Sequence, residues 1–380
     1  MSIWETLSWT EDGQEHRARW RSENGTPAPK RVQVADDRMT ADAAFRLACE
    51  GTALLWRGDY HNARQLLSAM KRRAARKPPR TGSTPAETFH LHRQAQSRHA
   101  RILGMLVVPV DRGHIVPLRR SPDVRSACAE AFGPAEESYV VSLRELLGVI
   151  GAHEWSRKGV PVPALGERIH PRYGVFSPVR GEYVDLVARA PLPSAESAFD
   201  IGTGTGVLAA VLARRGVRRV VATDQSAAAL ACSRENLTRL GLLDHVELLE
   251  ADLFPPGRAP LVVCNPPWVP GRPTSPVEYA VYDPGSRMLR GFLAGLAGHL
   301  EPGGEGWLIL SDIAERLGLR SRAELLELVE AAGLRVLDRL DTSPVHPRSR
   351  DTADPLHAAR ASEVTSLWRL VAAPATATAD

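Results

Sequence analysis

The residues Asn265-Pro266-Pro267-Trp268 form the most specific chemical pattern in the sequence. Each proline lacks a backbone N–H and has a fixed φ, so this loop is stiff and its carbonyl oxygens can face a ligand. An NH2 group can donate one proton to the Asn265 side-chain oxygen and the other to the Pro266 carbonyl, while Trp268 offers a flat surface for stacking. This pattern predicts a site that holds a planar amino or amide nitrogen.

Such a nitrogen is a poor nucleophile because its lone pair is delocalised into the adjacent π system, as in a peptide bond. Two acceptors that draw on its protons favour a more tetrahedral nitrogen, with its lone pair directed at an electrophile. Correct placement of the reacting atoms can itself contribute on the order of 7–11 kcal/mol. The loop therefore favours catalysis by positioning.

A second pattern, DIGTGTG, runs from Asp200 to Gly206, after an apolar strand-like segment and before a helical one. Glycines there let a ligand approach the backbone closely, because no Cβ blocks it. The spacing G-x-G-x-G differs from the G-x-G-x-x-G of dinucleotide sites. The Asp200 carboxylate would repel a pyrophosphate but suits an ammonium group. We therefore expect Asp200, Gly202, Gly204 and Gly206 to bind the methionine part of S-adenosyl-L-methionine (AdoMet).

Two further carboxylates stand at the ends of the next apolar segments. Asp224 ends VVATD and is placed to accept hydrogen bonds from both ribose hydroxyls. Asp252 ends HVELLEAD and is placed to accept from the adenine amine, with Leu253 beside the ring. One such acid can equally be a helix cap or a solvated strand end. Three acids at successive strand ends, after a glycine turn, favour a cofactor site.

The elements that must position these residues alternate between strand and helix from residue 198 onward. Five short strands rich in Val, Ile and Leu are expected at 198–202, 217–224, 245–252, 259–267 and 306–311. A helix at 323–333 and strands at 334–341 and 363–373 follow. Alternation of this kind predicts an α/β fold, with a mostly parallel seven-stranded, Rossmann-like sheet covered by helices on both faces.

In this order and spacing, the motifs resemble those of class I AdoMet-dependent methyltransferases over about residues 171–373. The Asn-Pro-Pro-Trp loop resembles the (Asn/Asp)-Pro-Pro-(aromatic) signature of amino methyltransferases. The segment at 282–310 resembles the release-factor glutamine methyltransferases and their relatives with a "small" methyltransferase domain. AdoMet already carries an activated methyl group, so neither a metal nor a strong base is required.

The same resemblance implies roles for other residues. Phe176 and Pro178, in YGVFSPVRGEYVDLVA, would flank AdoMet, and Asn265 would contact the cofactor as well as the acceptor. Asp283 and Arg287 become candidates for acceptor binding, because the connection that carries them would face the methyl group.

We expect three regions: a poorly ordered N-terminal segment at 1–37, an accessory or substrate-recognition domain at 38–160, and the methyltransferase domain at 161–375. The middle region is expected to be mixed but mainly helical, with helices at 40–56, 60–76, 86–100 and 142–154 and short strands at 102–110 and 114–120. The segment from residue 61 to residue 105 contains ten Lys or Arg residues and a single acid, Glu87. Such a block indicates either a polyanionic partner such as RNA or a solvated helix end with a flexible linker.

The composition is that of an ordinary globular protein, with 43% hydrophobic and 24% charged residues in 380 and a net charge of +4. There is no apolar run of eighteen residues and no signal-peptide pattern, so we expect a cytoplasmic protein with no membrane segment. The four cysteines lack paired spacing and are expected to be reduced thiols, with no metal site. The oligomeric state is not predicted.

The sequence thus favours an AdoMet-dependent N-methyltransferase that acts on a planar nitrogen, with a protein glutamine side chain first among acceptors. Its alternatives are an exocyclic base amine in nucleic acid, with RNA favoured over DNA, and a small molecule. A non-catalytic AdoMet-binding module is the alternative outside enzymology, and the intact Asn-Pro-Pro-Trp loop argues against it.

Overall fold

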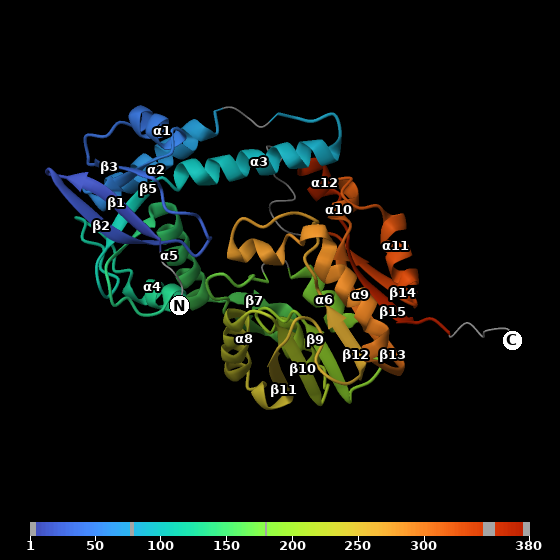
Figure 1. Cartoon of the computed structure of the whole chain (residues 1–380). Coiled ribbons are helices and arrows are strands. Elements are labelled where there is room, and N and C mark those ends of the chain that lie inside the picture. Colours follow the sequence, from blue (N-terminus) through green and yellow to red (C-terminus); the bar gives the residue numbers. More distant parts are fainter. Residues whose placement is uncertain (1–4, 77–79, 179–180, 345–353, 375–380) are drawn as a thin grey trace. The chain divides into compact units, whose positions relative to one another are not determined.

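The computed structural model describes residues 5–76, 80–178, 181–344 and 354–374. The chain divides into two compact units (Figure 1), which are described separately. Unit 1 contains Met1–Thr81 and His90–Glu154, and unit 2 contains Gly82–Phe89 and Trp155–Asp380. No helix in the described part of the chain is long and apolar enough to cross a membrane.

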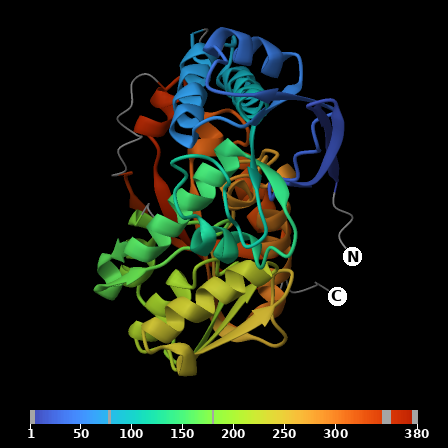
Figure 2. The same ribbon diagram turned by 90° about the vertical axis from the view of Figure 1, so that its left-hand side faces the viewer.

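Among the described residues, unit 2 is built on a seven-stranded sheet of order β11-β10-β9-β12-β13-β15-β14, which Figure 2 shows from a second side. The strands are β9 (Ser197–Ile201), β10 (Arg219–Asp224), β11 (Val246–Glu250), β12 (Ala259–Cys264), β13 (Leu300–Ser311), β14 (Leu334–Thr342) and β15 (Thr365–Ala372). Strands β9 to β13 are parallel to one another, and β15 is antiparallel to both β13 and β14. The expected mostly parallel, seven-stranded α/β fold is confirmed.

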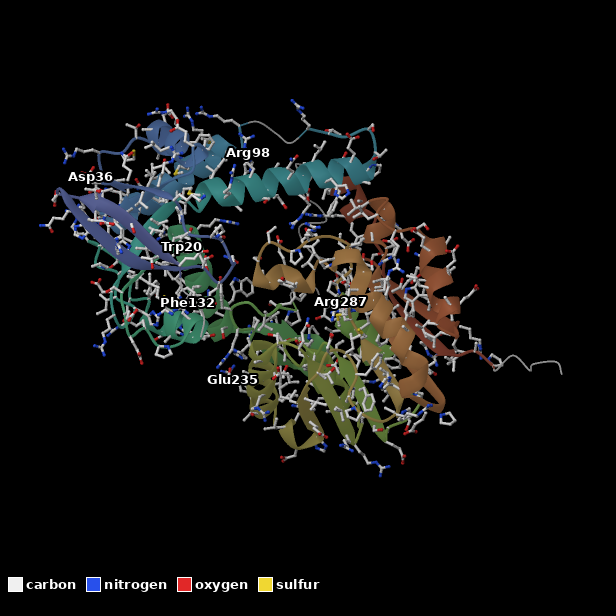
Figure 3. All side chains as sticks on the ribbon, in the orientation of Figure 1. Trp20, Asp36, Arg98, Phe132, Glu235 and Arg287 are labelled. Carbon is white, nitrogen blue, oxygen red and sulfur yellow. The ribbon has the colours of Figure 1, made fainter. Side chains whose placement is uncertain are left out.

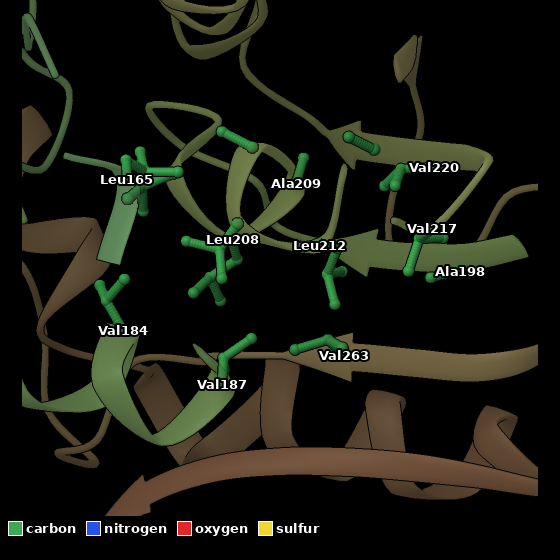
Figure 4. Close-up of a cluster of buried hydrophobic side chains, with 14 of the residues drawn as sticks. Leu165, Val184, Val187, Ala198, Leu208, Ala209, Leu212, Val217, Val220 and Val263 are labelled. Carbon is green, nitrogen blue, oxygen red and sulfur yellow. The ribbon is translucent and has the colours of Figure 1, made fainter. Parts of the chain in front are cut away.

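Helices cover both faces of this sheet because successive strand residues point to opposite sides. In β12, Val263 joins one core with α6, α7 and α8, whereas Val262 joins the other core with α9 and α11. Figure 4 shows part of the first core, including Val187, Leu212 and Val263. The helices are α6 (Glu182–Arg189), α7 (Val207–Arg214), α8 (Ala227–Arg239), α9 (Arg287–His299), α10 (Ile313–Arg316), α11 (Arg322–Ala331) and α12 (His357–Ala361).

Short elements complete unit 2. A two-stranded sheet of β7 (Val160–Val162) and β8 (Glu167–Ile169) precedes α6, with the 3-10 turn η1 (Pro163–Leu165) between its strands. Further 3-10 turns are η2 (Leu243–His245), η3 (Pro276–Ala280) and η4 (Pro284–Ser286). The last two lie in the connection between β12 and α9, so this connection has local structure of its own.

Within the described residues, unit 1 holds a six-stranded mixed sheet of order β1-β2-β6-β5-β4-β3. Its strands are β1 (Thr6–Glu11), β2 (Gln14–Arg21), β3 (Arg31–Ala35), β4 (Thr52–Trp56), β5 (Leu106–Val110) and β6 (Tyr139–Ser142). The accompanying helices are α1 (Ala41–Cys49), α2 (Tyr60–Ala74), α3 (Pro85–Leu103), α4 (Arg125–Phe132) and α5 (Leu143–Lys158). The first residues of α3 and the last of α5 are assigned to unit 2.

The expectation of a poorly ordered segment at 1–37 is wrong for its described residues, which form three strands. Asp12 and Gly13 both have positive φ, and Glu11 pairs with Gln14 across them. An Asp-Gly pair with positive φ at both positions is the tight hairpin turn whose twist matches two antiparallel strands. The turn signal was present in the sequence, but the polar composition around it obscured the strands.

Two expectations in the middle region also need correction. Residues 52–56 were expected to continue a helix, yet they form β4, with all five side chains buried. A short apolar run fits a fully buried strand as well as a helix, so periodicity alone does not separate them. The segment at 114–120 was expected to be a strand but forms only a single bridge, between Asp111 and Ile115.

Candidate active site

The predicted cofactor and catalytic motifs converge at one edge of the sheet of unit 2. Strands β10, β9 and β12 are parallel neighbours, so their carboxyl ends lie at the same edge. The connections leaving β9 and β12 run to opposite sides of the sheet, which is where open α/β sheets form ligand crevices. The glycine turn follows β9, Asp224 ends β10, Asp252 follows β11, and Asn265 follows β12.

All three glycines of the turn have left-handed backbones, with φ of 73° at Gly202, 58° at Gly204 and 81° at Gly206. A Cβ at Gly202 would lie 2.6 Å from the Met288 Cε, and one at Gly206 would lie 3.2 Å from the Ser233 Cβ. A Cβ at Gly204 would meet no atom within 4 Å. Gly204 therefore presents bare backbone to open space, whereas the other two glycines pack against protein.

Asp224 fastens this turn to the end of β10. Its Oδ2 accepts from the Gly204 N–H at 3.0 Å, and its Oδ1 accepts from the Ser226 N–H at 2.9 Å. Burial raises the pKa of this carboxyl, and the backbone donors act in the opposite direction. A carboxylate oxygen can accept more than one hydrogen bond, so the same group can also receive ribose hydroxyls.

Asp200 has a different role from the one predicted. It is only 1% exposed, and its Oδ2 accepts from the Thr203 Oγ1 at 2.6 Å and the Ala209 N–H at 3.1 Å. Burial raises the pKa of this carboxyl to about 6. Asp200 is not among the described residues that line the cavity. It braces the glycine turn from inside, because its partners belong to the turn and to the first residues of α7.

The Asn-Pro-Pro-Trp loop is held by a bond between its two ends. The Trp268 Nε1 donates to the Asn265 Oδ1 at 2.9 Å. Cys264, just before the loop, is fully buried, and burial raises the pKa of its thiol well above the ordinary value. All four residues of the loop line the cavity.

The end of β11 carries the predicted adenine-side residues. Leu253 has φ 81°, which is costly for a leucine, and its carbonyl accepts from the Thr223 Oγ1 at 2.6 Å. Asp252 forms an ion pair with Arg287, the first residue of α9 and labelled in Figure 3. The Asp252 carboxylate thus has a protein partner at the cavity, which the sequence did not suggest.

Asp283, expected to bind the acceptor, caps a helix instead. Its side chain is buried and accepts from the backbone N–H groups of Met288 and Leu289, in the first turn of α9. Carboxylates at this position satisfy N–H groups that have no partner within the helix. Arg287, the other acceptor candidate, does line the cavity.

The cavity that these elements enclose has a volume of about 860 Å³. Its lining includes most of the predicted site residues: Phe176, Gly202, Gly204, Asp224, Asp252, Leu253, Asn265, Pro266, Pro267 and Trp268. Pro178 and Gly206, like Asp200, are described residues that do not line it. Sequence reasoning missed Phe89, Leu356 and Glu363, which line the cavity from segments with no recognisable motif. It also gave no role to Tyr282, which lines the cavity as well.

AdoMet fits the residues that line this cavity. Gly204 offers exposed backbone with room for a ligand, and Asp224 places a carboxylate beside it. The volume falls within the range of about 300–1,000 Å³ that small-molecule and cofactor sites occupy. In the part of the chain that is described, no group of three or more His, Cys, Asp or Glu residues can hold a metal ion.

Comparison with known proteins agrees with this assignment. The family model described as "Methyltransferase small domain" matches residues 168–323. The release factor glutamine methyltransferase of Cereibacter sphaeroides is 33% identical over 176 residues, covering 43% of this chain and 62% of that protein. That of Moorella thermoacetica is 40% identical over 119 residues, covering 28% and 42%.

A relative with a different named substrate also matches. Ribosomal RNA small subunit methyltransferase C of Alcanivorax borkumensis is 36% identical over 113 residues, covering 29% of this chain and 31% of that protein. The chain therefore spans less than two thirds of the length of each of these relatives. Residues 168–323 are therefore a methyltransferase small domain, and these matches indicate AdoMet as its cofactor.

Proposed function

We propose that this protein transfers the methyl group of AdoMet to a planar amide or amino nitrogen, and that its acceptor is a glutamine side chain in a protein. One observation carries the proposal: Asn265 lies in the cavity wall with its side-chain oxygen fixed, in the loop whose residue types suit an NH2 group. The names of the two release factor relatives favour glutamine among the planar nitrogens.

The loop residues would act by holding the nitrogen in place. An amide oxygen has two lone pairs, so Asn265 Oδ1 retains one for the acceptor after receiving the Trp268 indole N–H. The Pro266 carbonyl would receive the second proton of the NH2 group. When bound, AdoMet supplies an electrophilic methyl group on a sulfonium. Asn265 and Pro266 would orient the nitrogen toward it, and placement of this kind can lower a barrier by on the order of 7–11 kcal/mol.

A direct test uses AdoMet labelled in the methyl group, the purified protein and a cell extract. Label in a glutamine amide should survive nuclease, be lost from the protein fraction after protease, and be released as methylamine by acid hydrolysis. The variant Asn265→Ala is the control for methylation by other enzymes in the extract. Label that is removed by nuclease would contradict the glutamine assignment but not the methyltransferase assignment.

A second acceptor, a base amine in RNA, is favoured by the basic block of unit 1. Lys71, Arg72 and Arg76 are exposed at the end of α2, whereas Arg73 pairs with Asp42. Lys77, also part of this block, lies outside the described residues. The ribosomal RNA methyltransferase among the relatives supports the same alternative.

A further inference from the structure

One side of the cavity is lined by an apolar wall, which we define as Phe89, Val269, Tyr282, Ile313, Leu317 and Leu356. Five of the six form one buried cluster, and Tyr282 packs against that cluster. The Phe89 and Tyr282 rings lie with their centroids 6.4 Å apart. These residues come from four separate stretches of unit 2, so the wall exists only in the folded protein.

The apolar wall adjoins the loop that would hold the acceptor nitrogen. Trp268 packs against the buried cluster of the wall, and its indole N–H donates to Asn265. Trp268 and Asn265 also line the same cavity as the wall. Any acceptor whose nitrogen reaches Asn265 therefore brings its neighbouring atoms close to this apolar surface.

The charged residues beside the wall already have protein partners. Arg360 pairs with Asp354, and the Glu363 carboxylate, 3% exposed, accepts from the Ser311 Oγ at 2.5 Å. A charged ligand group placed here would have to compete with these partners and lose its hydration as well. An apolar group, in contrast, gains free energy when it leaves water for such a surface.

Two wall residues lie outside the segment that matches the family model. Phe89 precedes residues 168–323 and Leu356 follows them, whereas the glycine turn and the Asn-Pro-Pro-Trp loop lie within that segment. The wall is thus completed by parts of the chain that the family domain does not supply. The methyl-transfer motifs therefore lie within the matched segment, whereas part of the wall lies outside it.

We propose that the apolar wall binds a bulky apolar side chain next to the methylated glutamine, so that the enzyme selects its acceptor by the residue flanking the glutamine. The inference rests on the proposed glutamine N-methylation and adds to it a sequence requirement. Burial of one large apolar side chain in a pocket changes selectivity by roughly 10- to 100-fold.

Three peptides test the requirement: Gly-Gly-Gln-Gly, Gly-Phe-Gln-Gly and Gly-Gln-Phe-Gly, each with an acetyl group and an N-methylamide so that no other primary amide is present. We expect kcat/KM for one phenylalanine peptide to exceed that of the glycine peptide by roughly 10- to 100-fold. Equal values for all three would overturn the inference and leave glutamine methylation intact. Methylation of a small aromatic amine but of none of the peptides would overturn both.

Variants locate the effect at the wall. Leu356→Ala and Phe89→Ala should each lower the ratio of kcat/KM between the preferred phenylalanine peptide and the glycine peptide by roughly five- to tenfold. Both peptides are measured on the same preparation, so a fraction of misfolded protein cancels in the ratio. Phe89→Leu, which keeps an apolar side chain, should retain an intermediate ratio.

The matched control is Leu326→Ala, because Leu326 is exposed on α11 and does not line the cavity. For this variant, the ratio of kcat/KM between the preferred phenylalanine peptide and the glycine peptide should equal that of the unmodified protein. An unchanged ratio in both Leu356→Ala and Phe89→Ala would show that the flanking residue is bound elsewhere, and the inference would fall.

Discussion

The indole Nε1 of Trp268 donates a hydrogen bond to the Asn265 Oδ1 at 2.9 Å, so the last residue of the Asn-Pro-Pro-Trp loop fixes the first. Phenylalanine at this position would keep the flat ring but lack the donor, and tyrosine would carry its donor at a different place. The tryptophan therefore adds a constraint on the orientation of the Asn265 amide.

Trp268→Phe tests this constraint. The ring is retained and one hydrogen bond of about 0.5–1.5 kcal/mol is lost, so kcat should fall about two- to tenfold. Affinity for S-adenosylhomocysteine, measured by titration calorimetry, should stay the same. Trp155→Phe, at an exposed tryptophan, is the control and should leave kcat unchanged. A fall in cofactor affinity equal to that in kcat would indicate that Trp268 serves the cofactor instead.

Asn265→Ala should separate catalysis from cofactor binding. It removes one of two proposed acceptors for the NH2 group, and loss of one positioned hydrogen bond in a transition state typically costs about 100-fold or more in rate. Cofactor affinity should remain within a few-fold, since Gly204 and Asp224 are untouched. Full methyl transfer by this variant would show that the acceptor nitrogen is not held by Asn265.

Asp224→Ala should weaken binding of S-adenosylhomocysteine about 10- to 100-fold, because it removes the proposed charged acceptor for the ribose hydroxyls, worth about 1.5–3 kcal/mol. The same carboxylate also holds the Gly204 N–H, so part of the loss would come from a looser glycine turn. Asp244→Ala, at an exposed aspartate away from the cavity, is the control. Equal affinities for the two variants would remove Asp224 from the site.

The buried Asp200 predicts a pH dependence of stability. Burial raises its pKa to about 6 in the folded protein. The folded state then holds this proton more tightly than the unfolded state, so the contribution of Asp200 to stability falls as pH rises from about 4 to about 6 and is level above. Relative to Asp200→Asn, the unmodified protein should lose about 1–1.5 kcal/mol of unfolding free energy between about pH 5 and pH 7.5 in urea titrations. If the difference in unfolding free energy between the two proteins stayed constant over this pH range, Asp200 would be ionised throughout it.

Salt dependence distinguishes the two macromolecular acceptors. With a protein acceptor, we expect RNA binding to vary little with salt, and Lys71→Glu, Arg72→Glu and Arg76→Glu together to leave methylation unchanged. If these residues contacted phosphates of a single strand, a plot of the log binding constant against the log salt concentration would have a slope of about −0.7 per neutralised phosphate. The triple reversal would then make this slope shallower by about two. Reversal of the exposed Arg234, Arg239 and Arg335, outside the basic block, is the control. A steep slope, together with label lost to nuclease, would replace glutamine by RNA as the acceptor.

The sequence pattern predicts the strands of unit 2 better than those of unit 1. In unit 2, each expected strand formed, because apolar segments at regular spacing can be buried on both faces only in a parallel sheet with helices on either side. In unit 1, β1 to β4 escaped prediction, because the polar strands β1 and β2 and the short buried strand β4 give weak or ambiguous periodicity.

The sequence by itself determined that the glycine turn, Asp224 and the Asn-Pro-Pro-Trp loop would meet. Each follows a strand of one parallel sheet, and parallel strands bring their carboxyl ends to the same edge. Only the tertiary structure decided which way the side chains face. Asp200 turns inward because Thr203 and Ala209 donate hydrogen bonds to its carboxylate there. Phe89 and Leu356, which are far apart in the sequence, both reach the cavity because they are buried in one apolar cluster. The formation of each strand is encoded locally, whereas these contacts depend on packing between segments that are far apart in the sequence.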